Sequence, residues 1–143
     1  MSFSEVERSI HIADDDPGVL NVLTEAVPII VAKLPGKYVI RPYGDGQEAY
    51  EGIQADGNEP ALLITDRNMP RMNGEELMRS AQGLWLTRHP LITVSTIMVS
   101  GGEADWDPKD PDFGKRLDAL GTRLIVKPIH IKVLREAIMD CLT

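Results

Sequence analysis

Short, largely β-branched apolar segments alternate along this chain with segments whose apolar residues recur at helical spacing. The expected strands cover residues 9–13, 37–43, 61–66, 95–101 and 123–128. The expected helices cover residues 19–34, 45–55, 74–86, 110–120 and 130–142. Alternation of this kind predicts a parallel sheet with right-handed crossovers and helices on both faces. We therefore expect one doubly wound α/β domain over residues 1–143, with its core at about residues 9–142.

Two prolines add detail to this prediction. Pro42 lies in the second expected strand and places that strand at a sheet edge, because proline cannot donate to a β-ladder. Pro28 lies inside the first expected helix, which it should kink or interrupt. The third strand, ALLITD, is almost continuously apolar, as is typical of a parallel strand covered on both faces.

Composition excludes several classes of protein. Hydrophobic residues make up 43% of the 143 residues, enough for one core, and the net charge is −7. An acidic chain without a run of Lys or Arg is not expected to contact nucleic acid. No segment approaches the roughly 18 apolar residues of a membrane span, and the N-terminal segment lacks signal-peptide character. The single cysteine, Cys141, favours a reducing compartment, so we expect a cytoplasmic protein.

Charged or hydroxyl-bearing side chains stand at the ends of four of the five expected strands. In an open parallel sheet, ligands bind outside the carboxyl ends of the strands, near the point where strand order reverses. The side chains that would meet there are Asp14, Asp15 and Asp16 after the first strand, Asp66 at the end of the third, Ser100 at the fourth and Lys127 at the fifth. This edge is therefore the candidate functional site.

This set of side chains suits the binding of a phosphoryl group. Neighbouring carboxylates repel one another, and a hard divalent cation such as Mg²⁺ relieves that repulsion. Lys127 would add a second positive charge and Ser100 a hydroxyl donor, and phosphoryl transfer depends mainly on positioning and charge neutralisation. A carboxylate can itself act as the nucleophile. Asp66 is the natural candidate, although a single Asp at a strand end is also common as a turn or helix-capping residue.

Four short motifs give the chain a resemblance to a known family. They are ADDDP at residues 13–17, ITDRNMPRMNG at 64–74, IMVSG at 97–101 and IVKP at 125–128. Each is commonplace alone, but together, in this order and at strand ends, they resemble the receiver domain of two-component response regulators. The resemblance spans about residues 10–142 and implies a flavodoxin-like fold with five strands in the order 2-1-3-4-5.

The resemblance also implies roles for the acidic residues. Asp66 would be the phospho-acceptor and a ligand of Mg²⁺. Asp15 would contact the ion directly and Asp14 mainly through water. The backbone carbonyl of Asn68 would complete the ligands from the protein. Asp16 matches no such role, and we expect it to cap the first helix.

Further roles follow for the later motifs. Ser100 would move towards the phosphoryl group as the switch hydroxyl, and Lys127 would pair with a phosphoryl oxygen. The Lys127–Pro128 peptide is expected to be cis. Pro70 and Gly74 would shape the loop that follows the acceptor.

A chain of this family would act as a signalling switch. A histidine kinase or a histidine phosphotransfer domain would donate the phosphoryl group to Asp66, and binding of an unidentified downstream protein would change. It would not be an enzyme beyond catalysing its own Mg²⁺-dependent phosphorylation and dephosphorylation. Homodimer formation is compatible with the family, and the sequence leaves open whether the domain stands alone or belongs to a larger protein.

Two segments depart from the family pattern. Many receivers carry Tyr or Phe three residues before the conserved lysine, where this chain has Leu124, so the usual aromatic readout is in doubt. Residues 101–114, GGEADWDPKDPDFG, form a long acidic connection with five Asp or Glu residues. It is either a tolerated surface insertion or a partner-specific loop, in which Trp106 would be a contact residue.

Two other functions compete with the switch. A phosphohydrolase of the haloacid dehalogenase type would use an Asp-x-Asp motif, which residues 14–16 contain. However, the acidic residues after Lys127, Glu136 and Asp140, lie on the last expected helix, and the segment 66–74 would be unexplained. A receiver-like binding module with altered readout is the other alternative, because of the aliphatic side chain before the lysine.

Overall fold

A computed structural model describes residues 6–101 and 108–143 of the chain. Trp106, expected as a contact residue, and most of the first half of the acidic connection lie outside these ranges. Within the described residues, no helix is long and apolar enough to cross a membrane.

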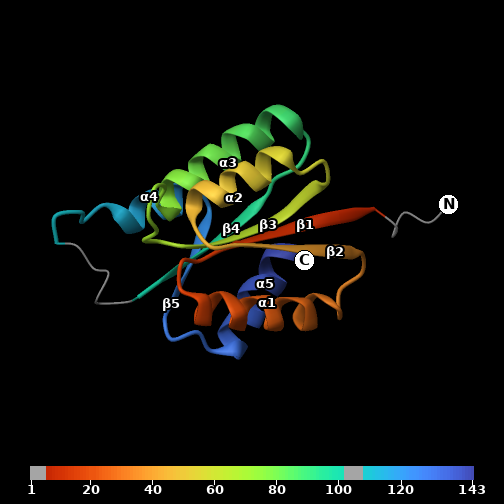
Figure 1. The fold of residues 1–143 in the computed structure, drawn as a ribbon, viewed down its shortest axis with the longest axis horizontal. Helices are drawn as coiled ribbons and strands as arrows, with labels where there is room; N and C mark the ends of the chain where they lie inside the picture. The colour runs from red at the N-terminus through yellow and green to blue at the C-terminus, as the bar shows by residue number, and fades with distance from the viewer. Residues whose placement is uncertain (1–5, 102–107) are drawn as a thin grey trace.

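The centre of the fold is a parallel sheet with the strand order β2-β1-β3-β4-β5 (Figure 1). This confirms the predicted order 2-1-3-4-5 and the predicted edge position of the strand that contains Pro42. The strands are β1 (Glu7–Ala13), β2 (Lys37–Tyr43), β3 (Glu59–Asp66), β4 (Ser95–Ser100) and β5 (Thr122–Val126).

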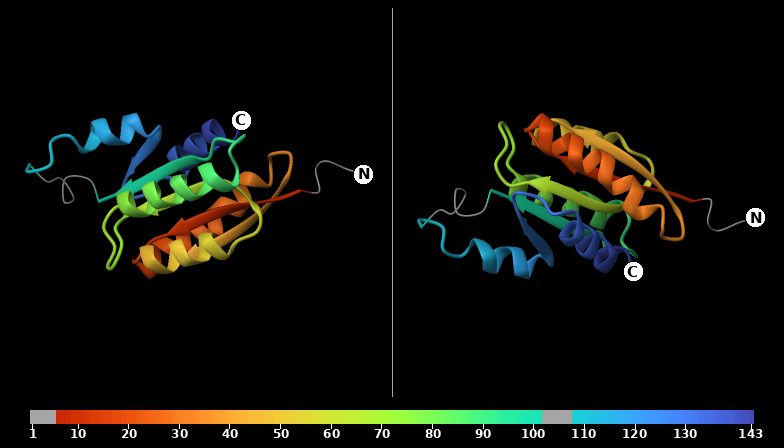
Figure 2. Two further views of the ribbon diagram at one scale, coloured as in Figure 1. Left: turned by 90° about the horizontal axis from the view of Figure 1, so that it is seen from above. Right: turned by 90° about the horizontal axis from the view of Figure 1, so that it is seen from below.

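Helices cover both faces of the sheet. They are α1 (Pro17–Val31), α2 (Gly46–Ala55), α3 (Gly74–Arg88), α4 (Phe113–Ala119) and α5 (Ile131–Leu142). Helices α1 and α5 lie on one face, and α2, α3 and α4 lie on the other (Figure 1). Seen from above, α2 and α3 run side by side across the sheet (Figure 2).

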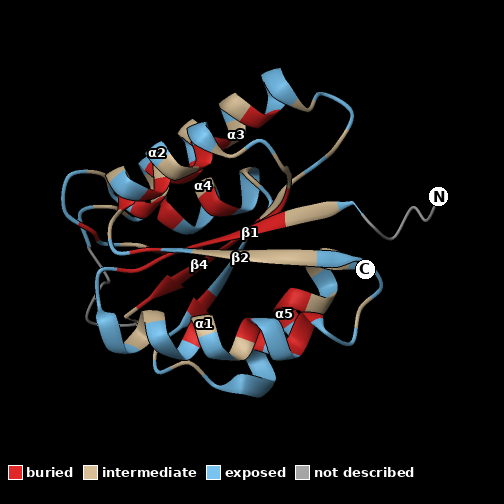
Figure 3. Ribbon diagram, turned by 45° about the vertical axis from the view of Figure 1, so that its right-hand side comes forward, coloured by how far each residue is buried: buried red, intermediate tan, exposed pale blue. Residues whose placement is uncertain are grey.

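Each face of the sheet has its own apolar core, because side chains alternate along a strand. In β1, Ile10 and Ile12 pack with residues of α1 and α5, whereas Ala13 packs with residues of α2 and α3. The central strand β3 is buried from Pro60 to Asp66. Buried residues concentrate on the sheet and the inner faces of the helices (Figure 3).

Helix α1 differs from its prediction. It begins at Pro17 behind the N-cap Asp16 and continues through Pro28 to Val31. Of the two effects expected of Pro28, a kink or an interruption, the interruption was wrong. Val27, Ile30 and Val31 are buried against the sheet. Their burial outweighs the backbone hydrogen bond that proline cannot donate.

Candidate functional site

The acidic side chains meet at the carboxyl edge of the sheet because β1 and β3 are neighbours. Ala13 pairs with Thr65 in the parallel register, so the next residues, Asp14 and Asp66, emerge side by side. One carboxylate oxygen from each of Asp14, Asp15 and Asp66 lies within 4.8 Å of the others. Asp14 and Asp66 are buried, with 1% and 5% of their surface exposed, while Asp15 is exposed.

Backbone contacts orient the first of these carboxylates. The N–H of Asp16 donates to Oδ1 of Asp14 over 2.8 Å, and the N–H of Asp14 donates to the carbonyl of Tyr43 over 3.2 Å. The other oxygen, Oδ2 of Asp14, is buried and accepts no hydrogen bond from the described residues. The cation close to this buried oxygen is Lys127, whose Nζ lies 3.4 Å away.

Lys127 reaches the same point from the end of β5. Its Nζ lies 3.2 Å from Oδ1 of Asp66 and 3.4 Å from Oδ2 of Asp14. Its backbone N–H donates to the carbonyl of Ser100 over 2.6 Å, and the peptide bond to Pro128 is cis, as expected. The ammonium group therefore lies between two acidic side chains that come from different strands.

Crowding of charge changes the affinities of these groups for protons. Burial, with the Asp14 charge as a second cause, raises the pKa of Asp66 to about 7. Burial also raises the pKa of Asp14. Burial alone would lower the pKa of Lys127, but the neighbouring carboxylates outweigh it and the pKa is raised. One positive side chain thus does not fully compensate the acidic cluster.

The donor set fits a hard divalent cation. Three carboxylates lie within reach of one ion, and Oδ2 of Asp14 lacks a hydrogen bond within the described part of the chain. Oxygen-only ligands, one of them exposed to solvent, suit Mg²⁺, which keeps several waters when it binds to proteins. Asn68 lies on the exposed loop two residues beyond Asp66, and the role of its carbonyl as a ligand stays a prediction.

The loop after β3 is packed tightly around the acceptor position. The N–H of Arg67 donates to Oδ1 of Asp66 over 2.9 Å, and the N–H of Gly74 donates to the carbonyl of Arg67 over 2.8 Å. A Cβ atom on Gly74 would lie 2.0 Å from the carbonyl oxygen of Asp66, so only glycine fits there. Arg71 adopts a φ of 68° and pairs with Asp45, the N-cap of α2.

The two residues predicted to convey a switch occupy different environments. Ser100 ends β4 and is 4% exposed at the same sheet edge as Asp66. Leu124 lies in β5, pairs in register with Met98 and is 45% exposed. Its side chain is therefore only about half-buried at the edge strand, and its switch role stays a prediction.

Two groups of interacting residues were not foreseen from the sequence. Arg67 and Arg116 lie against the ring of Phe113. Both pair with Asp110, which precedes α4, and Arg116 also pairs with Glu75 of α3. His11 is buried between Tyr43 and Asp56, with Nδ1 2.9 Å from the Tyr43 hydroxyl and Nε2 3.3 Å from Oδ2 of Asp56. The partners are 32 to 45 positions from His11, so local sequence carries no signal of them.

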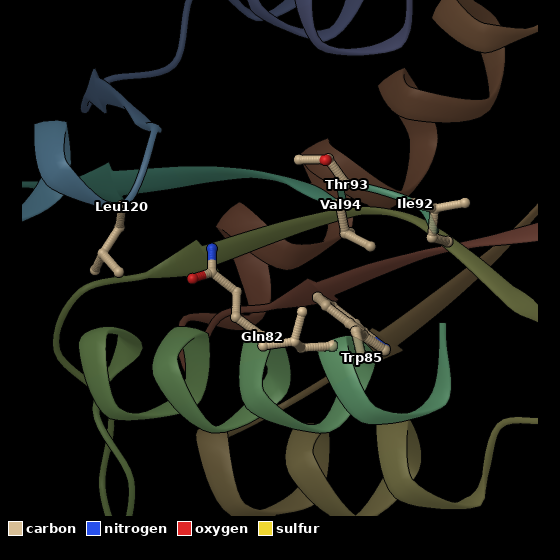
Figure 4. A pocket seen from close by; sticks show the side chains of 7 residues that line it. Gln82, Trp85, Ile92, Thr93, Val94 and Leu120 are labelled. Carbon is tan, nitrogen blue, oxygen red and sulfur yellow. The ribbon is translucent and has the colours of Figure 1, made fainter. Parts of the chain in front are cut away.

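A separate cavity of 290 Å³ lies at the opposite edge of the sheet (Figure 4). It is lined by Gln82, Trp85, Leu86, Ile92, Thr93, Val94 and Leu120. Val94 and Leu120 come just before the starts of β4 and β5, whereas Asp66 ends its strand. The lining contains no charged side chain, so this cavity plays no part in the chemistry of the acidic cluster. Trp85 is 5% exposed and belongs to the core on the α2 and α3 side of the sheet.

The chain is similar in sequence to two known bacterial proteins. The chain is 34% identical over 91 residues to the chemotaxis protein CheY1 of Helicobacter pylori (strain ATCC 700392 / 26695), covering 64% of this chain and 65% of that protein. It is 30% identical over 132 residues to protein-glutamate methylesterase/protein-glutamine glutaminase 2 of Vibrio vulnificus (strain YJ016), covering 84% of this chain and 35% of that protein. The chain thus spans less than two thirds of either relative.

The fold also matches solved structures. The CheX–CheY–BeF₃–Mg complex from Borrelia burgdorferi matches with a TM-score of 0.66 and 19% identity, over 95% of this chain and 90% of that chain. The family model of the response regulator receiver domain matches residues 10–139. With the acidic cluster, the lysine and the strand order all in place, the chain belongs to the response regulator receiver domain family.

Proposed function

We propose that this receiver domain is a phosphorylation-controlled switch that accepts a phosphoryl group on Asp66 in the presence of Mg²⁺. The observation that carries the proposal is the convergence of Asp14, Asp15 and Asp66 within 4.8 Å, with Nζ of Lys127 3.2 Å from the acceptor carboxylate. The phosphoryl donor would be a histidine kinase or a histidine phosphotransfer domain.

Asp14, Asp15 and Asp66 would hold the ion, together with the backbone carbonyl of Asn68. When bound, Mg²⁺ would neutralise charge on the phosphoryl oxygens. Lys127 has an ammonium group that would bind a phosphoryl oxygen once Asp66 is modified. The buried position of the acceptor excludes most water from its carboxylate, which strengthens each of these attractions.

In the transfer step, a carboxylate oxygen of Asp66 attacks the phosphorus atom of a phosphohistidine. A new O–P bond forms while the P–N bond breaks, and its electron pair returns to the imidazole of the donor. The nucleophile must be ionised, but the pKa of Asp66 is raised to about 7. Positive charge beside the carboxyl group lowers this pKa and so favours the ionised, reactive form. Hydrolysis of the aspartyl phosphate by water would reset the switch.

The modified state would signal through a change in conformation. Ser100, which ends β4 at the same sheet edge, would donate its hydroxyl to a phosphoryl oxygen, and the changed surface would bind a downstream protein. The structure from Borrelia burgdorferi contains CheY together with a partner protein, CheX, which supports partner binding as the output here. Homodimer formation stays a prediction.

Mass spectrometry of the intact protein tests the proposal directly. After incubation with Mg²⁺ and acetyl phosphate, we expect one phosphoryl adduct on the wild type and none on Asp66→Asn or without Mg²⁺. Because some receivers ignore small donors, a titration with beryllofluoride followed by NMR completes the test. No adduct and an unchanged NMR spectrum would reject the phospho-switch and favour a constitutive binding module.

The same preparation discriminates against the phosphohydrolase alternative. Such an enzyme would release phosphate from phosphomonoesters over many turnovers. In this structure Asp140 lies on α5 and pairs with Arg123, and Glu136 lies on the same helix. Neither stands at a strand end beside Asp66, so we expect no multiple turnover.

A further inference from the structure

Arg67, the residue that directly follows the acceptor, connects the acidic site to α4. Its side chain is only 14% exposed. The guanidinium carbon lies 3.7 Å from the centre of the Phe113 ring, and Nη2 lies 3.7 Å from Oδ2 of Asp110. Phe113 is the first residue of α4 and is 7% exposed. The cationic side chain of the residue that follows Asp66 in the chain thus covers the start of this helix.

Arg116 binds the same carboxylate, that of Asp110, more closely than Arg67 does. Its guanidinium binds both carboxylate oxygens of Asp110 at 2.7 Å and both of Glu75, on α3, at 2.8 and 2.9 Å. Asp110 is therefore held mainly by Arg116, and its contact with Arg67 is the longer of the two. Arg67 can leave Asp110 without leaving that carboxylate unpaired.

Helix α4 is the shortest helix among the described residues and relies on tertiary contacts. It has seven residues, and its N-cap residue, Asp112, makes no capping hydrogen bond through its side chain. A helix this short is not stable by itself. Its position follows from the packing of Phe113 and Leu117 and from the ion pairs of Arg116.

Leu124 offers no alternative link between the site and this helix. It has neither a ring nor a hydroxyl, and it is 45% exposed on β5. A route from Asp66 to α4 through Arg67 would not require an aromatic side chain at that position. This accounts for a receiver in which the aromatic residue is replaced.

We propose that Arg67 senses the phosphoryl charge on Asp66 and transmits it to α4 through Phe113 and Asp110. This inference rests on the proposed function. Phosphorylation replaces the single negative charge of the Asp66 carboxylate with about two on the phosphoryl group, which draw the guanidinium of Arg67 from Phe113 and Asp110 towards the phosphoryl oxygens. Phe113 then loses the closer of its two cation–π contacts, keeping that of Arg116 at 5.8 Å, and the first turn of α4 loosens. The downstream partner would recognise α4 in this altered state.

Hydrogen exchange of residues 108–120, measured by mass spectrometry with Mg²⁺ and with or without beryllofluoride, tests this route. In the wild type we expect exchange in α4 to rise at least about threefold on loading. In Arg67→Gln, exchange in α4 is high without beryllofluoride and does not rise further on loading. Arg67→Lys keeps the charge and should recover part of the response, whereas a purely steric role would make the Lys and Gln variants alike.

The matched control is Arg79→Gln. Arg79 also pairs with Glu75, at 3.0 Å, but it is half-exposed on α3 and does not contact Phe113. We expect this variant to respond like the wild type. Phe113→Leu, which keeps Arg67 but removes the ring, should lose the response and serves as a second variant if Arg67→Gln does not fold.

Binding of beryllofluoride is followed separately by ¹⁹F NMR, with Asp66→Asn as the negative control. If the wild type binds it and α4 does not respond, or if Arg67→Gln responds like the wild type, the inference is overturned and the proposed function stands. If the wild type binds no beryllofluoride, the proposed function fails and the inference fails with it.

Discussion

Gly74 shows how strictly a single residue constrains the acceptor loop. It begins α3, and a Cβ atom there would lie 2.0 Å from the carbonyl oxygen of Asp66. Because that neighbour is backbone at the end of a buried strand, it cannot move without displacing the acceptor. The backbone geometry of this loop therefore helps to fix the position of the Asp66 carboxylate.

We expect Gly74→Ala to lower the free energy of unfolding by about 2 kcal/mol and to slow phosphorylation of Asp66 by more than about tenfold. Gly83→Ala is the matched control on the same helix, since no atom lies within 4 Å of its added Cβ. That change should stabilise the protein by about 0.5–1 kcal/mol. Urea unfolding and the rate of adduct formation measure both, and equal effects of the two variants would contradict the steric argument.

His11 is the buried histidine whose role sequence could not reveal. Burial is the main cause that lowers its pKa from the usual 6.5 to about 4, opposed by Asp56 and assisted by Arg41. In the neutral ring, Nδ1 can accept the Tyr43 hydroxyl at 2.9 Å, while Nε2 lies 3.3 Å from Oδ2 of Asp56. Protonation in the folded protein would place a second cation beside Arg41 in a closed space.

This lowered pKa predicts a loss of stability in acid. A group whose pKa is depressed by folding contributes stability above about pH 6.5, and that contribution is lost as the pH falls through about 4. The loss attributable to His11 is at most about 3 kcal/mol. His11→Gln cannot take up a proton, so its unfolding free energy should fall less steeply between pH 6.5 and 4. Parallel curves for the two proteins in urea titrations would contradict the assignment.

Helices α1 and α4 begin with an aspartate but differ in how it is used. At α1, Oδ1 of Asp16 accepts the N–H of Gly18 at 2.8 Å and that of Val19 at 3.4 Å. At α4, Asp112 makes no such bond. The cap at Asp16 was predicted from the sequence, because Asp is a preferred N-cap residue and Asp16 matched no role in the acidic site.

We expect Asp16→Ala to lower the free energy of unfolding by about 1 kcal/mol, the usual effect of losing an N-cap. Asp112→Ala should change it by less than about 0.5 kcal/mol, because its contact with Lys115 is exposed. Both are measured by urea denaturation at one pH. Similar losses in the two variants would show that charge near the helix start, rather than the cap hydrogen bonds, is responsible.

At the scale of the whole molecule, sequence predicted the features that follow from strand order. Asp14, Asp66, Ser100 and Lys127 each stand at a strand end, so placing the strands in a parallel sheet also places these side chains at one edge. Contacts such as Arg116 with Glu75 could not be predicted, since two side chains 41 positions apart must first be brought together by packing. Interruption of α1 at Pro28 was wrongly expected because tertiary burial outweighed local propensity.

The acidic edge also makes the stability of the whole fold dependent on pH and on Mg²⁺. The pKa of Asp66 is raised to about 7, so its stabilising contribution is present below about pH 4 and is lost as the pH rises through 7. Asp66→Asn removes this like-charge repulsion. Without Mg²⁺ at pH 8, we expect the free energy of unfolding of Asp66→Asn to be about 2 kcal/mol higher than that of the wild type.

Lowering the pH to 5 should shrink this difference, because the wild-type carboxyl then binds a proton in the folded state. Adding Mg²⁺ at pH 8 should stabilise the wild type more than Asp66→Asn, since the ion binds the folded site and loses one ligand in the variant. Urea unfolding in EDTA and in Mg²⁺, at both pH values, measures all four differences. A wild type that matches the variant at pH 8 in EDTA, or that gains nothing from Mg²⁺, would show that the three carboxylates do not form a mutually repelling cation site.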